Sequence, residues 1–297
     1  MYSSPIIDSM DASLALMEYT SCVEANLTQE LLSTSEELEF QFNALVNAAN
    51  YFENYTCSDY NLPTSPSIRN ETWTYKGMNY EVGIMHERPR SMIHVLSNFV
   101  TEEECQAIDE AATTGLHAGT LAGEITPERK VMQAYIPVDW EKEAEGDIIA
   151  KLSRRLYDYV NHATGLGIRE KGQEDIMSIQ YAGRGTNETH PDRYVPHCDG
   201  DCDGSPYSLG ARFATMIMYC TTPLKGGSTN FLNAGIHVVA TKGAATFFSY
   251  IGSDDFINDN GFTRHSGCPV IEGEKKIITQ FFRVGVDDDH PWDFFET

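Results

Sequence analysis

Short strand-like segments separated by turns fill the chain after residue 175, and this pattern limits the folds open to it. The segments are rich in β-branched and aromatic residues, and they are Ile176–Tyr181, Ala211–Tyr219, His237–Ala240, Ala244–Tyr250 and Ile277–Val284. Helix-like segments come before them rather than between them, so the order is not that of a parallel sheet. The predicted fold class is therefore α+β, with a double-stranded β-helix (jelly-roll) core and supporting helices.

Two supporting helices are expected before the strands. Thr101 and Glu104 have the spacing of a capping box, which opens a helix that runs to about residue 113. Asp147–Thr164 is a second helix, because its apolar residues fall on one face.

The N-terminal part of the chain has a different residue pattern, typical of helices followed by a linker. Apolar residues recur at roughly helical spacing from residue 8 to residue 52, and a turn-rich stretch follows. We therefore predict a short N-terminal helical segment over 1–56, a linker over 57–87 and the main domain over 88–297. The N-terminal helices are also a candidate surface for oligomer formation.

His197 and Asp199 stand two residues apart in a strand-like segment, so their side chains point to the same side of the sheet. His265 would add a third ligand. Two imidazoles and one carboxylate on one face of an octahedron are the ligands by which non-haem oxygenases bind Fe(II). Taken alone, His-x-Asp is a common pattern, and a polar pair in a loop has the same letters. Lys275 strengthens the metal interpretation, because it adds a cation near a metal that needs an anionic co-substrate.

The charge of the chain excludes some functions. It has 44 acidic and 21 basic residues, which gives a formal net charge of −23. Phosphate binding needs clustered positive charge, so we expect no nucleic-acid partner and no anionic membrane surface. We also expect no membrane span, because no run of about eighteen apolar residues is present.

The compartment is less well defined by the sequence. Both N-glycosylation sequons and cysteines favour the endoplasmic reticulum lumen or secretion, and the sequons begin at Asn26, Asn54, Asn70 and Asn187. The N-terminus shows no basic region followed by an apolar stretch, which leaves a cytoplasmic location open. Among the cysteines, Cys22 and Cys57 could clamp the N-terminal helices. Cys198 alternates away from the two ligands beside it, so we expect it to be a bystander.

Further motifs stand in a fixed order around these residues. They are Arg88-Pro89-Arg90, Tyr194-Val195-Pro196-His197-Cys198-Asp199, Gly226-Gly227-Ser228-Thr229-Asn230-Phe231, Lys242-Gly243-Ala244-Ala245 and Arg264-His265 with Cys268-Pro269-Val270. Together they resemble the prolyl 4-hydroxylase family of 2-oxoglutarate-dependent Fe(II) dioxygenases. The resemblance runs from about residue 88 to 283, which is about two thirds of the chain.

The resemblance implies a role for each site residue. His197, Asp199 and His265 would hold Fe(II), 2-oxoglutarate would fill two further positions, and dioxygen would take the last. Lys275 would pair with the distal carboxylate of 2-oxoglutarate, Tyr181 would donate its hydroxyl to the same carboxylate, and Thr229 is a further candidate. Lys276 is a rival for the ion pair, but adjacent strand residues face opposite ways and the spacing from His265 favours Lys275. Ascorbate is expected to restore iron that becomes oxidised.

The implied substrate is a proline-containing polypeptide. A lysine at the co-substrate position and Cys-Pro-Val after His265 are similar to the collagen and plant cell-wall types of the family. The implied reaction is hydroxylation of peptidyl proline to 4-hydroxyproline, with decarboxylation of 2-oxoglutarate to succinate and CO2. The loop 183–194 could close over the peptide through Tyr194, Arg184 or Arg193. A plain surface loop is an equal alternative.

Some positions depart from the family, and they leave other functions open. Lys276 and Phe281 stand where the family commonly has tryptophan. The family's animal enzymes often bond the cysteine at position 268 to one near the C-terminus, but no cysteine follows Cys268, so it is expected to be free or paired with Cys220. The alternatives are a 2-oxoglutarate hydroxylase that acts on another side chain or a small molecule, a non-catalytic binding protein on the same fold, and a cupin-like protein with another metal.

Overall fold

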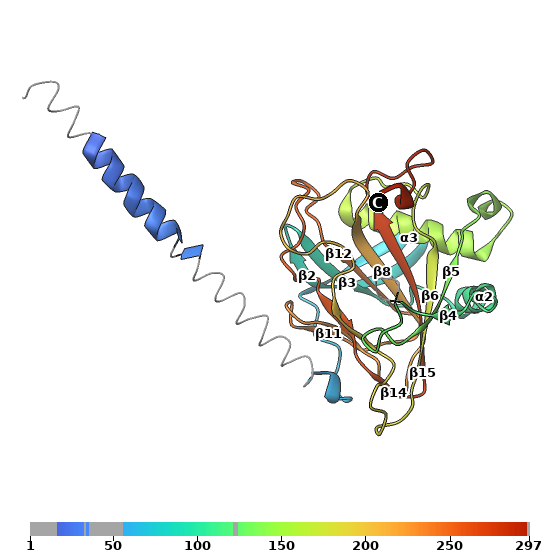
Figure 1. Ribbon diagram of the computed structural model, residues 1–297. Coiled ribbons are helices and arrows are strands. Elements are labelled where there is room, and N and C mark those ends of the chain that lie inside the picture. Colours follow the sequence, from blue (N-terminus) through green and yellow to red (C-terminus); the bar gives the residue numbers. More distant parts are fainter. Residues whose placement is uncertain (1–16, 33, 36–55, 121–123, 296–297) are drawn as a thin grey trace, which may run out of the picture. The chain divides into compact units, whose positions relative to one another are not determined.

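The computed structural model describes residues 17–32, 34–35, 56–120 and 124–295, and the chain divides into two units, Met1–Asn50 and Tyr51–Thr297. In the first unit, residues 17–32 form an α-helix whose side chains are almost all exposed (Figure 1). Most of the other residues of the predicted 1–56 helical segment lie outside the described residues. No helix among those described is both long enough and apolar enough to cross a membrane.

The second unit is built on a large antiparallel sheet (Figure 1). Its nine strands are, in spatial order, β1 (Arg69–Tyr75), β2 (Met78–Arg88), β3 (Ser91–Leu96), β12 (Ala245–Ser249), β8 (Arg212–Thr221), β15 (Glu274–Arg283), β6 (Ile176–Ala182), β5 (Met132–Ile136) and β4 (His117–Ala118). The central strands β12, β8, β15 and β6 are apolar and buried, as expected for strands covered on both faces.

A smaller sheet faces the central strands. Its four strands are β11 (Ile236–Val238), β10 (Thr229–Phe231), β13 (His265–Gly267) and β7 (Tyr194–His197), and a two-stranded ladder joins β14 (Val270–Glu272) to β9 (Lys225–Gly226). Two antiparallel sheets in this arrangement make the predicted jelly roll. Apolar side chains from both sheets, such as Ile217 of β8 and Phe231 of β10, share one core.

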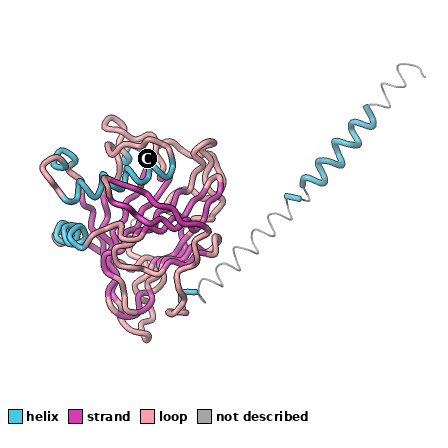
Figure 2. The backbone as a smooth tube through the Cα atoms, turned by 180° about the vertical axis from the view of Figure 1, so that it is seen from behind, coloured by secondary structure: helices cyan, strands magenta, loops and turns pink. Residues whose placement is uncertain are grey.

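The helices cover the opposite face of the large sheet. They are α2 (Glu102–Ala112) and α3 (Ile148–Thr164), with short 3-10 helices at Trp140–Glu143 and Trp292–Phe295. Alternation along β8 explains the two-sided packing: Met216 and Met218 contact the helix-side core, whereas Ile217 points into the core between the sheets. Figure 2 shows the longer helices of the second unit along the left and upper edge of the strand block.

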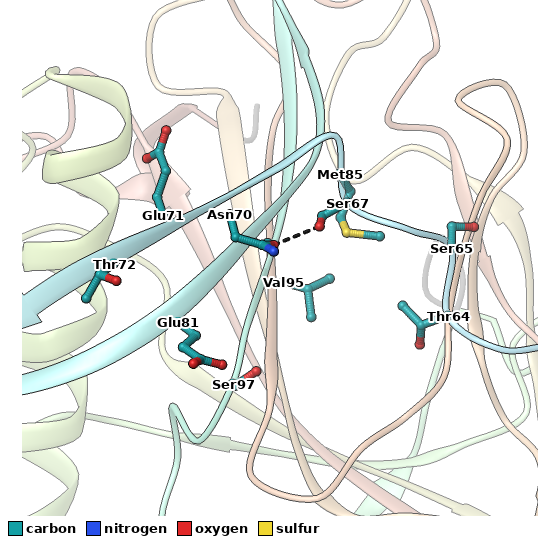
Figure 3. A pocket seen from close by; sticks show the side chains of 11 residues that line it. Thr64, Ser65, Ser67, Asn70, Glu71, Thr72, Glu81, Met85, Val95 and Ser97 are labelled. Atoms are coloured by element: carbon teal, nitrogen blue, oxygen red, sulfur yellow. Dashed lines mark hydrogen bonds between the residues drawn. The ribbon is translucent and has the colours of Figure 1, made fainter.

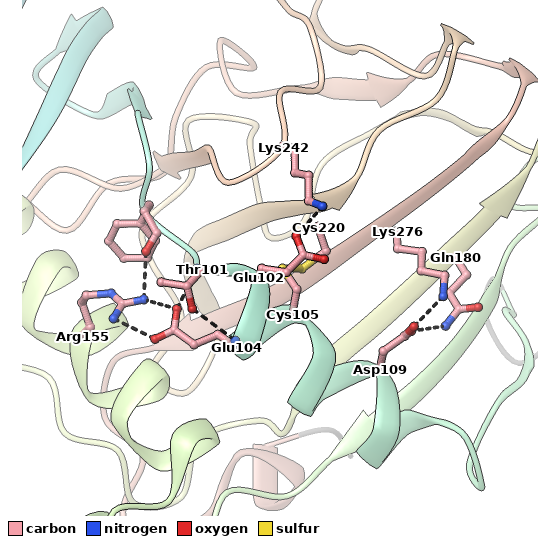
Figure 4. The surroundings of a disulfide bond; sticks show 11 residues. Thr101, Glu102, Glu104, Cys105, Asp109, Arg155, Gln180, Cys220, Lys242 and Lys276 are labelled. Carbon is pink, nitrogen blue, oxygen red and sulfur yellow. Dashed lines mark hydrogen bonds and ion pairs between the residues drawn. A yellow bond between two sulfur atoms is a disulfide. The ribbon is translucent and has the colours of Figure 1, made fainter.

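Both helices begin where the sequence predicted. Thr101 caps α2, and Glu104 closes the capping box while its carboxylate also binds the buried Arg155 of α3 at 2.6 Å (Figure 4). Asp147 caps α3 by accepting a hydrogen bond from the amide of Ala150, and Gly165 ends the helix at φ 71°. The Glu104–Arg155 pair therefore fixes the two helices to each other.

The predicted linker over 57–87 is wrong in its second half. Residues 69–88 form the hairpin β1–β2 at the edge of the large sheet, with Lys76 and Gly77 at positive φ in the turn. Trp73 and Tyr80 are buried in the helix-side core. The sequence pattern missed β1 because an edge strand exposes most of its side chains, and Trp73 is its only buried residue.

The structure contains three disulfides, and they correct the expectations for the cysteines. Cys57 bonds to Cys268, Cys105 to Cys220 (Figure 4) and Cys198 to Cys202. The expected Cys22–Cys57 clamp is therefore absent, and Cys22 is exposed and unbonded. Cys268 does not pair with Cys220. Cys198 is bonded to Cys202 and is not among the clustered metal ligands, as expected of a bystander to the metal. Spacing along the sequence could not show these pairs, because the partners meet only in the folded sheets.

Removing the Cys57–Cys268 disulfide should destabilise the protein strongly. The bond joins residues separated by 211 positions, so its loss frees a very large loop in the unfolded chain. We expect the double variant Cys57→Ser, Cys268→Ser to lose about 2–5 kcal/mol in free energy of unfolding, measured by urea denaturation. The variant Cys22→Ser is the control and should unfold like the unaltered chain. A double variant that also unfolds like the unaltered chain would contradict a stabilising role for this bond.

Candidate metal centre

The predicted ligands come together at neighbouring strands of the small sheet. His197 ends β7 and His265 begins β13, and the two residues lie directly opposite each other in the ladder. Asp199 follows two residues after His197. One ligand atom from each of the three side chains lies within 4.8 Å of the other two. Nε2 of His197 is 3.2 Å from Oδ1 of Asp199, and Nε2 of His265 is 3.7 Å from Oδ2.

Backbone carbonyls orient both imidazoles. Nδ1 of His197 donates to the carbonyl of Val195 at 2.8 Å, and Nδ1 of His265 donates to the carbonyl of Thr263 at 3.0 Å. Since a carbonyl only accepts, the proton sits on Nδ1 and leaves the Nε2 lone pair for a metal. Burial lowers the pKa of His265 to about 4, so this ring is neutral near pH 7 and able to bind a cation.

Asp199 supplies the negative charge of the group. Burial by itself would raise the pKa of its carboxyl, but nearby positive charge, from His265 and His197 when either is protonated and from Arg212, holds that pKa well below its usual value. The ionised carboxylate accepts a hydrogen bond from the Thr215 hydroxyl at 2.8 Å. Two imidazoles and one carboxylate fit Fe(II), and they leave room for further ligands.

Lys275 lines the same pocket. Its side chain is only 2% exposed, and no ion pair to a carboxylate is formed in the described part of the chain. The rings of Tyr181 and Tyr219 lie 5.3 and 5.8 Å from its Nζ atom. Burial lowers the pKa of Lys275 to about 7. A buried ammonium without a counter-charge is unfavourable, so the pocket is suited to an anion.

Lys276 is held on the other face of the sheet. Its Nζ atom pairs with Asp109 of α2 at 2.5 Å, and Gln180 binds the same carboxylate at 3.1 Å (Figure 4). Strand alternation thus separates the two lysines as predicted. Lys275 lies opposite Tyr181 in the β15–β6 ladder, so the cation and the tyrosine face the pocket together.

Thr229 and Tyr219 form a hydroxyl pair at the pocket. Thr229 lies on β10 and lines the pocket, and its hydroxyl is 3.0 Å from that of Tyr219. The Tyr219 hydroxyl is also 3.0 Å from that of Thr246. Tyr219 was not predicted as a site residue. It stands two positions from Ile217 on β8 and both side chains face inward, a spacing that could have identified it.

Of the three predicted substrate residues, only Tyr194 lines the pocket. Its ring stacks on that of His197 with 3.5 Å between centroids. Arg184 is exposed and pairs with Asp192 at 3.3 Å, and neither Arg184 nor Arg193 is among the residues that line the pocket. Arg129, which the sequence analysis missed, lines it and lies 5.1 Å from the Tyr194 ring. No motif surrounds Arg129, so only the fold places it there.

A larger hollow of about 380 Å³ lies between the β1–β3 edge and the segment at 64–67 (Figure 3). Hydroxyls, the Asn70 amide and the carboxylates of Glu71 and Glu81 line it, and Asn70 accepts a hydrogen bond from Ser67 at 2.7 Å. It contains none of the predicted ligands. The donor atoms, and not the size of the hollow, therefore identify the pocket at His197 as the candidate centre.

Comparison with known proteins agrees with this geometry. The chain is 28% identical to prolyl 4-hydroxylase subunit alpha-3 of Rattus norvegicus over an alignment of 210 residues, which covers 67% of this chain and 34% of that protein. It is 28% identical to prolyl 4-hydroxylase subunit alpha-1 of Caenorhabditis elegans over 192 residues, covering 63% of this chain and 32% of that protein. The aligned part is thus about a third of the length of these relatives. No protein-family model matches the chain.

One solved structure shows the same fold. The viral collagen prolyl hydroxylase of Paramecium Bursaria Chlorella virus-1, in its complex with 2OG, superimposes with a TM-score of 0.50 and 24% identity. The match covers 65% of this chain and 96% of the viral protein. The expected jelly roll and the resemblance to prolyl 4-hydroxylases are both confirmed.

Proposed function

Because the chain is similar to prolyl 4-hydroxylases over two thirds of its length, we propose that it is a 2-oxoglutarate-dependent Fe(II) dioxygenase. It hydroxylates peptidyl proline to 4-hydroxyproline and converts 2-oxoglutarate to succinate and CO2. One observation carries this proposal: His197, Asp199 and His265 converge in the pocket that also contains the buried Lys275, which pairs with no carboxylate among the described residues. Three metal ligands beside a cation that can bind an anion are what an Fe(II) oxygenase with a dicarboxylate co-substrate requires.

The residues of the pocket have three roles: metal binding, co-substrate binding and exclusion of water. The three ligands hold Fe(II), and Lys275 with the hydroxyls of Tyr181 and Thr229 binds the distal carboxylate of 2-oxoglutarate. When bound, iron and 2-oxoglutarate supply the oxidising power needed for an unactivated C–H bond. Isoleucine and phenylalanine side chains in the pocket lining exclude water, and these are Ile179, Ile217, Ile277 and Phe281. Ascorbate is the proposed reductant for iron that becomes oxidised.

Tyr194 is the proposed contact for the peptide substrate. Its ring lies against His197, between this ligand and Arg129, so a proline ring held there would be next to the metal. The loop 183–194 that carries it is anchored by Asp192, which accepts from the amide of Ala182 at 2.8 Å. Arg184 and Arg193 belong to the same loop, and they are proposed to contact the peptide farther from the metal.

The affinity for 2-oxoglutarate should fall with rising pH. In the empty pocket the pKa of Lys275 is about 7, so above that pH a growing fraction of the side chain is neutral. The dicarboxylate then binds only after a proton is taken up, and affinity should decrease with a slope that approaches tenfold per pH unit. Calorimetric titration of the Mn(II)-loaded protein tests this. Lys275→Arg is the control, because arginine keeps its charge and should give a flat profile. A flat profile for the unaltered chain would contradict the assignment of Lys275.

We also propose a secretory location and an assembly role for the N-terminal helix. Three disulfides support the first proposal, as do the exposed sequon residues Asn26, Asn70 and Asn187. Exposed apolar residues on helix 17–32 support the second, and they include Leu27, Leu31 and Leu32. Light scattering of the full chain beside a chain that starts at residue 57 tests the assembly; equal masses would contradict it.

The direct test of the reaction is identification of the product. The protein is incubated with Fe(II), 2-oxoglutarate, ascorbate and a proline-rich peptide, and mass spectrometry locates any added oxygen. We expect 4-hydroxyproline in that peptide, none in a peptide with alanine in place of proline, and none when a chelator removes iron. Consumption of 2-oxoglutarate with no modified proline would indicate a different substrate. No consumption at all would favour a non-catalytic binding protein.

A further inference from the structure

A buried threonine, Thr215, contacts the metal-binding carboxylate of Asp199. Thr215 lies in the middle of the large sheet on β8, where Phe248 of β12 and Phe281 of β15 flank it. It is 0% exposed. It is the only polar residue in the run from Phe213 to Met218, and it faces the core between the sheets, as Ile217 does. A hydroxyl at so apolar a position needs a partner.

That partner is Asp199. The Thr215 hydroxyl is 2.8 Å from Oδ2 of Asp199 and 3.3 Å from the hydroxyl of Tyr250. An ionised carboxylate only accepts, so Thr215 donates its single proton to Oδ2. The remaining contact then requires Tyr250 to donate to Thr215. Burial raises the pKa of Tyr250 well above its usual value, which keeps this phenol protonated as a donor.

The chain of hydrogen bonds therefore has one direction, from Tyr250 through Thr215 to Asp199. Tyr250 is itself fixed, because it is 1% exposed and its amide donates to the carbonyl of Phe213 at 2.9 Å. The bond at Oδ2 leaves Oδ1 as the oxygen free of a hydroxyl partner, and Oδ1 is the one 3.2 Å from Nε2 of His197. A carboxylate held in this way cannot turn freely about its terminal torsion.

We propose that Thr215, supported by Tyr250, is a positioning residue that holds Oδ2 of Asp199 so that Oδ1 is presented to the metal. This inference rests on the proposed Fe(II) site. Hydrogen bonds to metal-binding carboxylates fix the orientation of the ligand before the metal arrives. Losing such a partner typically lowers metal affinity by about 10- to 100-fold.

The test measures metal affinity rather than turnover. Co(II) serves as the probe, because its visible absorption reports both binding and ligand geometry, and it is titrated into the metal-free full chain. Thr215→Val removes the hydroxyl and keeps the shape of the side chain. We expect it to bind Co(II) about 10- to 100-fold more weakly, with an altered absorption spectrum. Thr215→Ser keeps the hydroxyl and should restore both affinity and spectrum.

Two more variants separate positioning from general stability. Thr164→Val removes another buried hydroxyl, which binds the carbonyl of Val160 in α3, and it should leave Co(II) affinity unchanged. Tyr250→Phe keeps Thr215 but removes its donor, so it should give a smaller loss, and it still tests the inference if Thr215→Val does not fold. Thermal unfolding of each metal-free variant shows whether the fold is retained.

The outcomes are distinct. If the unaltered chain binds Co(II) and the folded Thr215→Val and Tyr250→Phe variants bind it equally well, the positioning role is wrong while the metal site stands. If Thr215→Ser fails to restore affinity, the hydroxyl is not the relevant group and the inference also fails. If the unaltered chain does not bind Co(II), the proposed metal site itself is overturned, and the role of Thr215 with it.

Discussion

Replacing Asp199 with alanine should abolish turnover of 2-oxoglutarate and remove metal binding, while the metal-free protein stays folded. Asp199 is the only anionic member of the trio, so its loss leaves two neutral imidazoles to hold a dication. The pKa of Asp199 is lowered in the folded protein, so the ionised carboxylate contributes stability at neutral pH, and its removal also leaves the buried Thr215 hydroxyl without its acceptor. The unfolding temperature of the metal-free variant should therefore fall modestly, while the protein still folds.

The control for this variant is in the same loop. Asp201 is exposed, so Asp201→Ala removes one negative charge nearby without touching the trio. It should keep both metal binding, measured by calorimetry, and succinate release. Turnover by the Asp199→Ala variant near that of Asp201→Ala would show that the carboxylate is not a metal ligand, and it would contradict the assignment of the centre.

Replacing Lys275 with alanine should cost most of the affinity for 2-oxoglutarate. The distal carboxylate would be buried without a cation, and breaking a buried ion pair from one side costs about 3–5 kcal/mol. Since about 1.4 kcal/mol is tenfold, the dissociation constant should rise by roughly two to three and a half orders of magnitude. Calorimetric titration of the Mn(II)-loaded variant measures this directly, and Mn(II) affinity itself should change little.

Lys276→Ala is the matched control, since its lysine is adjacent in sequence but pairs with Asp109 on the opposite face. It should bind 2-oxoglutarate like the unaltered chain. Lys275→Ala should also raise the unfolding temperature of the metal-free protein, because it removes a buried ammonium for which the described part of the chain offers no paired carboxylate. If Lys276→Ala lost the co-substrate and Lys275→Ala did not, the two faces of β15 would be wrongly assigned.

Much of the candidate site could be predicted because it depends on local rules. The two-residue alternation of a strand separated Lys275 from Lys276. His197 and Asp199 converge as their close spacing predicted, although β7 ends at His197 and Asp199 lies just beyond it. The pairing of β7 with β13 brings His197 and His265 together, and the pairing of β6 with β15 brings Tyr181 and Lys275 together. All four were predicted as site residues. The helices were predictable for a similar reason, since capping residues such as Thr101 and Asp147 act within a few positions.

The features that were missed depend on contacts between distant segments. Strand β1 has one buried residue, so its sequence resembles a polar linker until β2 pairs with it. Cys57 and Cys268 meet only when the segment before β1 lies against the small sheet. No role was predicted for Arg129 or Thr215, and each gains one from a neighbour distant in the sequence: Tyr194 for Arg129 and Asp199 for Thr215.

Succinate release from 2-oxoglutarate, measured together with 4-hydroxyproline formation, tests the central claim most directly. The Fe(II)-loaded protein is assayed with and without a proline-rich peptide. The account predicts that the peptide stimulates succinate release and that succinate and 4-hydroxyproline form in equal amounts, because each turnover oxidises one co-substrate and one proline. Protein that contains iron in the His197, Asp199 and His265 site but releases no succinate under these conditions would contradict it.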